Sequence, residues 1–152
     1  PAEYLRGIAL EKAKCFMSVD LYDQAAKNFE EFISISHHEK LPLKHGFTLR
    51  WNLAFCYYHL NDFNKMQMIG KGLVTNHPTN PISHFVFGLA LQGAQKYTEA
   101  IQSFDKSLEL DPNQPDVQNA KLRLVQQLTG LSPNLEAFKM ESPPQMSLEQ
   151  AT

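Results

Sequence analysis

The stretch 81–114 reads PISHFVFGLALQGAQKYTEAIQSFDKSLELDPNQ and decides the fold of this chain. From Tyr97 to Leu108, apolar residues recur at the i, i+3, i+4, i+7 spacing of an amphipathic helix, with charged residues between them. The first half of the stretch, around Phe85, has its apolar residues at the same helical spacing. Residues 93–96 form a connection short enough to fold two helices back antiparallel, and Pro112 ends the second one because proline lacks a backbone N–H. The stretch therefore predicts a helix–turn–helix hairpin.

Small and large residues occupy complementary places in this hairpin. Gly88 and Ala100 are small where the two backbones need to approach, and Phe104 is large where a gap needs filling. This arrangement resembles the 34-residue tetratricopeptide repeat, although the chain has His84 where that family often has tryptophan. The residues that carry the resemblance are Gly88, Leu91, Ala100, Phe104 and Pro112. The resemblance implies an all-α fold, a right-handed α-solenoid of stacked helical hairpins.

Two earlier segments repeat the pattern. Pro78, Phe63 and Ala54 each stand 34 residues before a counterpart in 81–114, which defines a second repeat at about 41–80. The first repeat, at about 3–39, matches at an offset of 75, or two repeats plus seven residues. We expect this seven-residue insertion to extend the first helix of the second repeat, which then runs from about 41 to 60. The alternative is a free loop to about residue 45.

The second helix of the second repeat departs from the family pattern. Met66 stands where the third repeat has a small alanine, and Gly70 stands where it has the large Phe104. The exchange is complementary, so the volume can be conserved by repacking. Gly70 and Gly72 each lower helix propensity by about 1 kcal/mol. We therefore expect this helix to be the least stable of the array.

Residues 115–129 predict one further helix, with Pro115 suited to its first turn and Gly130 to its end. An apolar stripe on one side and polar residues on the other are what the last helix of a solenoid needs, so it is expected to be a capping helix. The stripe consists of Val117, Ala120, Leu124 and Leu128. The repeats and this helix make one domain over 1–130. The remaining 131–152 are expected to be a flexible tail, in which 134–140 could form one short helix.

Composition excludes several classes of protein. Lys+Arg number 14 and Asp+Glu 16 among 152 residues, so there is no basic excess for nucleic acid. No apolar run is long enough to span a bilayer, and no signal segment opens the chain. The first residue is proline, so we expect an excised piece of a longer protein, with any missing repeats on the N-terminal side. Cys15 and Cys56 fall in the same slot of successive repeats, which indicates free thiols in a reducing compartment, the cytoplasm.

Nothing in the sequence indicates a reaction centre. The six histidines show no metal-ligand spacing, and the glycines form no phosphate-binding loop. No nucleophile motif is present. The chain is therefore not expected to be an enzyme, nor to hold a cofactor or a metal.

Partner binding follows from the family resemblance, which implies that the first helix of each repeat lines a concave groove. Helical geometry groups Trp51, Phe55 and Tyr58 at i, i+4, i+7 on one face of a helix whose other face also carries apolar residues, and a core needs only one of them. The alternative is that Trp51 is buried by the insertion, by the tail or by further repeats. The candidate partner-binding residues are Leu10, Lys14, Met17, Trp51, Phe55, Tyr58, Phe85 and Leu89.

The function expected from these features is a non-enzymatic interaction module that binds an apolar or amphipathic peptide, or a helical segment, of a partner protein in the aromatic groove. A structural segment of a larger repeat scaffold in a multiprotein complex is the alternative, and a small chaperone or carrier of a partner protein is a more distant one. Repeats of this family that clamp the acidic C-terminus of heat-shock chaperones use basic groove residues. Here Ser83, Phe87 and Leu91 stand where the third repeat would need them, so such a carboxylate clamp is not expected.

Overall fold

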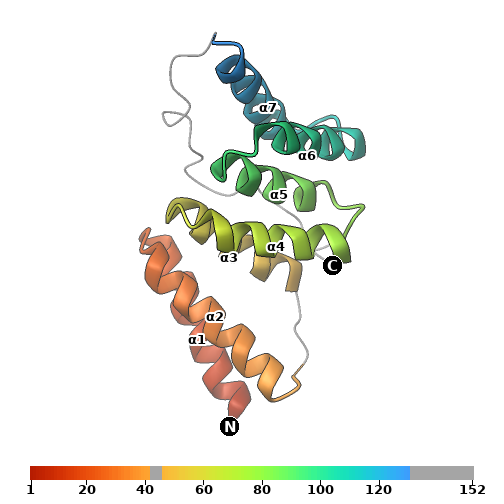
Figure 1. The fold of residues 1–152 in the computed structure, drawn as a ribbon. Helices are drawn as coiled ribbons and strands as arrows, with labels where there is room; N and C mark the ends of the chain where they lie inside the picture. The colour runs from red at the N-terminus through yellow and green to blue at the C-terminus, as the bar shows by residue number, and fades with distance from the viewer. Residues whose placement is uncertain (42–45, 131–152) are drawn as a thin grey trace. The chain divides into compact units, whose positions relative to one another are not determined.

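The computed structural model describes residues 1–41 and 46–130. These residues form seven α-helices and no strand, so the predicted all-α fold is confirmed (Figure 1). The helices fall into two compact units, α1 to α3 up to Asp62 and α4 to α7 from Phe63 onward. The helix bounds are α1 Ala2–Ser18, α2 Tyr22–His38, α3 Gly46–His59, α4 Phe63–Asn76, α5 Pro81–Gly93, α6 Tyr97–Leu110 and α7 Pro115–Leu128.

In the first unit, α1 and α2 form a hairpin whose interface is built mainly from alanines and phenylalanines. Ala13 and Ala25 are completely buried, and Phe29 is nearly so. Arg6 ties the far end of the hairpin together, because its guanidinium lies 5.2 Å from the Phe32 ring centroid and its Nη1 donates to Ser36 Oγ at 3.2 Å. A cation over an aromatic face contributes about 0.5–1 kcal/mol where it is partly exposed.

A common turn joins the two helices of each hairpin. Asp20, Asn61 and Gln95 all have left-handed backbone conformations, with φ of 60°, 58° and 64°. Each donates its N–H to the carbonyl three residues earlier, as Gln95 does to Gln92 at 3.0 Å. A second helix begins two residues later in every case. The predicted short connection at 93–96 is therefore confirmed, and the same turn recurs in the other hairpins.

In the second unit, the helices approach each other at glycines. A Cβ placed on Gly88 of α5 would lie 2.6 Å from the Phe104 ring of α6, so only glycine admits that ring. A Cβ on Gly93 would overlap the Phe63 ring of α4. The small-and-large pairing read from residues 81–114 thus sets the spacing of α5 and α6, which lie side by side in Figure 1.

In α4 the large Met66 and the small Gly70 exchange the sizes found in the third repeat, and the structure does not accommodate this by repacking side chains alone. Met66 is fully buried, as a large residue at that place should be. At Gly70, however, the space is taken by main chain, because a Cβ there would lie 2.8 Å from the Cα of Phe87. The glycine lets the backbone of α5 close onto α4, and no side chain replaces the missing aromatic.

Two features differ from expectation, the start of one helix and the burial of one residue. The preferred early start of the first helix in the second repeat is not observed, because Leu41 is not helical and α3 begins at Gly46. Residues 42–45 lie outside the described residues, as does the expected tail 131–152. In α7, Val117 and Leu124 are buried against the rest of the unit, but Leu128 is half exposed, although it was expected in the packed stripe.

The two glycines of α4 give a matched test of this packing. Gly70→Ala should destabilise the chain by about 1–2 kcal/mol, because overpacking against a main-chain atom outweighs the gain in helix propensity. Gly72→Ala should stabilise it by about 0.5–1 kcal/mol, since a Cβ at Gly72 meets nothing within 4 Å. Urea unfolding followed by circular dichroism measures both. Equal effects of the same sign at the two positions would contradict the close approach at Gly70.

Candidate functional site

The residues of α3 predicted to share one face do come together. The Phe55 ring lies between that of Trp51, 6.1 Å away between centroids, and that of Tyr58, 6.3 Å away. His59 also packs edge-on against Phe55 at 4.5 Å. Aromatic pairs of this kind contribute about 0.5–1.5 kcal/mol beyond the area they bury. One helix therefore presents four rings in a single rigid group.

A fifth ring comes from α2. Tyr22 stacks flat on His59, with centroids 4.3 Å apart and planes 7° apart, and meets Phe55 edge-on at 6.1 Å. We call these five residues the aromatic cluster: Tyr22, Trp51, Phe55, Tyr58 and His59. Tyr22 was not among the partner-binding residues expected from the sequence. Its position at the start of a second helix, shared with Phe63 and Tyr97, was the available signal, but the signal did not show which rings it would meet.

A carboxylate fixes the orientation of Tyr22. Its hydroxyl donates to Asp20 Oδ1 at 2.9 Å, and Asp20 is the left-handed residue of the turn just before α2. Burial, and next the bond to Asp20, raise the pKa of Tyr22 to about 12, so the ring carries its proton throughout the physiological range. The turn that closes the first hairpin thus also positions a member of the aromatic cluster.

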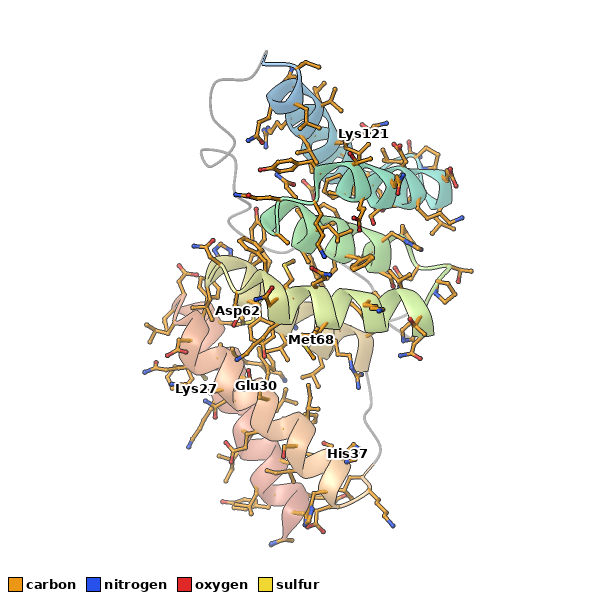
Figure 2. All side chains as sticks on the ribbon, in the orientation of Figure 1. Lys27, Glu30, His37, Asp62, Met68 and Lys121 are labelled. Atoms are coloured by element: carbon orange, nitrogen blue, oxygen red, sulfur yellow. The ribbon has the colours of Figure 1, made fainter. Side chains whose placement is uncertain are left out.

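The opposite side of α3 forms core. Leu53, Ala54 and Cys56 are buried there. Tyr57 is buried as well and donates its hydroxyl to the Glu30 carboxylate on α2, whose place Figure 2 shows. Desolvation, then the neighbouring Glu30, raise the pKa of Tyr57 well above its usual value. Both sides of α3 are therefore covered, since Trp51 is only 2% exposed, as a helix that is apolar all round requires.

The predicted partner-binding residues differ in accessibility. Trp51 and Phe55 are buried, and Tyr58 at the edge of the cluster is half-buried. On α1, Leu10 and Met17 are half-buried, and Lys14 is exposed and pairs with Glu11 at 3.2 Å.

The other two predicted residues lie on α5 in the second unit, where Phe85 and Leu89 are buried. The Phe85 ring lies 6.0 Å from that of Phe104, so its burial is explained by its own repeat. A partner-binding role for the eight residues stays a prediction, and the accessible surface for it lies on α1 and at Tyr58.

Other kinds of site find no support in the described part of the chain. Among residues 1–41 and 46–130, no group of three or more His, Cys, Asp or Glu side chains is placed to hold a metal ion. No helix within those same ranges is long and apolar enough to cross a bilayer. The cytoplasmic location stays a prediction. At the places where a carboxylate clamp would need cations, Ser83 and Leu91 are buried.

Comparison with known proteins bears on the class of fold. A family model of the tetratricopeptide repeat matches residues 83–114. The first such domain of human RPAP3 superposes with a TM-score of 0.66 at 20% identity, covering 84% of this chain and 95% of that chain. The first repeat domain of Spaghetti (RPAP3), bound to the HSP90 peptide SRMEEVD, gives 0.67 at 21%, covering 82% and 93%.

A third solved structure, the C-terminal repeat domain of a putative FK506-binding protein from Plasmodium falciparum, gives a TM-score of 0.72 at 19% identity, covering 85% of this chain and 91% of that chain. A search of curated protein sequences finds no match.

The family match shows a tetratricopeptide repeat at residues 83–114, as the stretch 81–114 predicted, and the solved structures show that the fold is that of tetratricopeptide-repeat domains. The chain has the all-α helical-repeat solenoid fold of that class. Proteins of this class are in general non-enzymatic modules for protein–protein interaction, which is the broad function that the fold supports.

The two cysteines give a test of the core around α3. Both are free thiols, but Cys15 is exposed and Cys56 is completely buried. Burial raises the pKa of the Cys56 thiol from 9.0 to about 12, and the thiolate is the reactive form. At pH 8 a thiol reagent should therefore label Cys15 within minutes and Cys56 only in denaturant, as mass spectrometry of the tryptic peptides would measure.

The same pKa gives the direction of a pH effect. The unfolded thiol loses its proton near pH 9 and the folded one only near pH 12. The stability that this difference contributes is complete below pH 9 and declines as the pH rises from 9 to 12. Native labelling of Cys56 at the rate of Cys15 would contradict the packing of α3.

Proposed function

We propose that this chain is an interaction module that binds a segment of a partner protein on the side of α1 that carries Leu10, Lys14 and Met17, and at the Tyr58 edge of the aromatic cluster. The family resemblance assigns both places to the concave side of the repeats. The observation that carries the proposal is the aromatic cluster itself. It is a group of five rings in mutual contact, of which Trp51 and Phe55 are buried and the other three, Tyr58 among them, are half-buried.

The physical argument concerns preorganisation. Tyrosine and tryptophan are frequent interface anchors, because they bury a large area at a small cost in side-chain entropy. Here Tyr58 is held by Phe55 and His59, so little further freedom is lost when a partner covers it. Trp51 and Phe55 then act as the support behind the contact surface, and a partner need not displace them.

The chemistry of the accessible residues indicates what kind of segment would bind. Leu10 and Met17 offer apolar surface, and Met17 has an adaptable side chain that suits varied partners. Lys14 lies between them in the i, i+4, i+7 series, so the side is apolar with one cation. This suits an amphipathic or extended peptide with apolar anchors, bound by the helix-in-groove or extended mode.

A matched pair of methionines tests the location. Met17→Ser should weaken capture of partner proteins roughly fivefold, the cost of losing about 1 kcal/mol at an interface. Met68→Ser should leave capture unchanged, because Met68 is 75% exposed on α4, a helix that contributes no residue to the proposed surface. The measurement is quantitative affinity capture with the wild-type chain and both variants, after circular dichroism has shown that each is folded. Equal capture by wild type and Met17→Ser would overturn the proposed location.

A second prediction concerns the peptide that a structural neighbour binds. Spaghetti (RPAP3) binds the HSP90 peptide SRMEEVD. In this chain Ser83, Phe87 and Leu91 provide no cation for its carboxylates, and two of the three are buried. Isothermal titration calorimetry with SRMEEVD should therefore give no saturable heat, under conditions in which the neighbour's own domain does. Saturable binding that Lys14→Glu abolishes would contradict this.

The alternative use, as a structural segment of a larger scaffold, is favoured by one observation. Large apolar side chains are exposed on the outer helices, among them Tyr4 and Leu5 of α1 and Leu122 of α7. A scaffold would cover such residues with neighbouring subunits or repeats. The two uses differ in solution, since a module is monomeric and soluble alone, whereas a scaffold segment associates through these residues.

A further inference from the structure

One side of α1 carries residues at the spacing with which two helices pack along their length. They recur at alternating intervals of four and three, which is the seven-residue repeat of a coiled coil. A different side of α1 meets α2, where Ala9 and Ala13 are buried. We call the first side the α1 seam, and it consists of Glu3, Gly7, Leu10, Lys14 and Met17.

The α1 seam is accessible along its whole length. Glu3, Gly7 and Lys14 are exposed, and Leu10 and Met17 are half-buried. A Cβ placed on Gly7 would meet nothing within 4 Å, so the space beside this glycine is open. Glycine inside a helix costs about 1 kcal/mol relative to alanine. What it provides at this position is room for a side chain of another helix to approach the backbone of α1.

The α1 seam is complementary to itself when a second copy of the helix runs antiparallel. In an antiparallel coiled coil, each of the two core positions of the repeat faces the other core position across the pair. This arrangement places Gly7 opposite Leu10 of the second copy, and Glu3 opposite Lys14 of the second copy. A two-fold axis repeats both pairings, because the same surface is used by both copies. Small therefore faces large, and negative faces positive, at four places along the pair.

Lys14 has the capacity for a second carboxylate. Its Nζ lies 3.2 Å from Glu11 Oε1 on the same helix, and both side chains are largely exposed. An exposed pair of this kind contributes little by itself, and it leaves further donors of the ammonium group available. Glu3 cannot reach Lys14 of its own chain, since eleven residues of helix separate them by about 16 Å. A pairing of Glu3 with Lys14 is therefore possible only between two molecules.

We propose that two copies of this chain associate through the α1 seam as an antiparallel pair of α1 helices. A helix of 17 residues is about 26 Å long, and one pair of them buries less than the roughly 1,200 Å² of a stable complex. The association is therefore weak and reversible. A copy on the seam would cover Leu10, Lys14 and Met17 and so close the surface proposed above to a partner. That consequence rests on the proposed function, whereas the association itself needs no partner.

Charge exchange in the full chain tests this inference by sedimentation equilibrium. The mass of the wild type should rise from that of one chain toward that of two between about 10 and about 500 µM, the range of a weak interface. Glu3→Lys alone or Lys14→Glu alone creates like-charged pairs across the axis and should weaken association roughly tenfold. The double variant, Glu3→Lys with Lys14→Glu, restores opposite charges and should associate within about threefold of the wild type.

The matched control is Lys12→Glu, after circular dichroism has shown that every variant is folded. Lys12 is also exposed on α1, but it lies about 200° around the helix from Lys14. It changes the net charge as Lys14→Glu does and should leave association unchanged.

Four results would overturn the proposal. They are the mass of a single chain at every concentration, single variants that associate like the wild type, a double variant no better than the single ones, and an equal loss for Lys12→Glu. Association that Leu5→Ser abolishes and Glu3→Lys does not would also overturn it, because Leu5 is 57% exposed on α1 but lies outside the seam.

Discussion

In the second unit the helices approach each other most closely at positions that have no side chain. Gly88 admits the Phe104 ring onto the backbone of α5, and Gly70 admits the backbone of α5 onto α4. Dispersion forces weaken steeply with separation, so a gap of even half an ångström loses much of each contact. The contact of Phe85 with Phe104 depends on this spacing, and so does the burial of Met66. The missing Cβ atoms at Gly70 and Gly88 thus set how closely α5 packs against α4 and α6.

The first unit meets the same constraint with alanine. Ala9 and Ala13 of α1 lie buried with Ala25 and Ala26 of α2, which leaves room for Phe29. Directional interactions then hold the helix pairs in register. Arg6 bridges α1 to α2, and the Tyr57 hydroxyl bonds to Glu30 between α3 and α2. Because these interactions involve groups with partly exposed ends, they add orientation to an interface whose stability comes mainly from apolar burial.

The candidate binding surface follows from this packing. Leu53, Ala54 and Tyr57 are buried on one side of α3, and Trp51, Phe55 and Tyr58 lie on the other side. Tyr22 joins that side only because α2 begins where the turn at Asp20 brings its ring over His59. The buried rings give rigidity and the half-buried Tyr58 gives access. A binding surface of this kind needs both, since a fully exposed group of rings would be an aggregation hazard and a fully buried one could not bind.

The class of fold, the turn at 93–96 and most of the helices could be predicted from the sequence, although the start of α3 could not. These depend on local periodicity, on turn residues and on a 34-residue register, all of which are visible in the chain itself. The sequence also placed Trp51, Phe55 and Tyr58 on one helical side, because that grouping is a property of one helix. The folded chain was needed to show that Tyr22 completes the cluster, that the main chain at Phe87 takes the space beside Gly70, and that Leu122, Val125 and Leu128 are exposed. The reason is that burial belongs to pairs of surfaces. A sequence shows which side of a helix is apolar, but which apolar side is covered depends on neighbours that only the folded chain brings together.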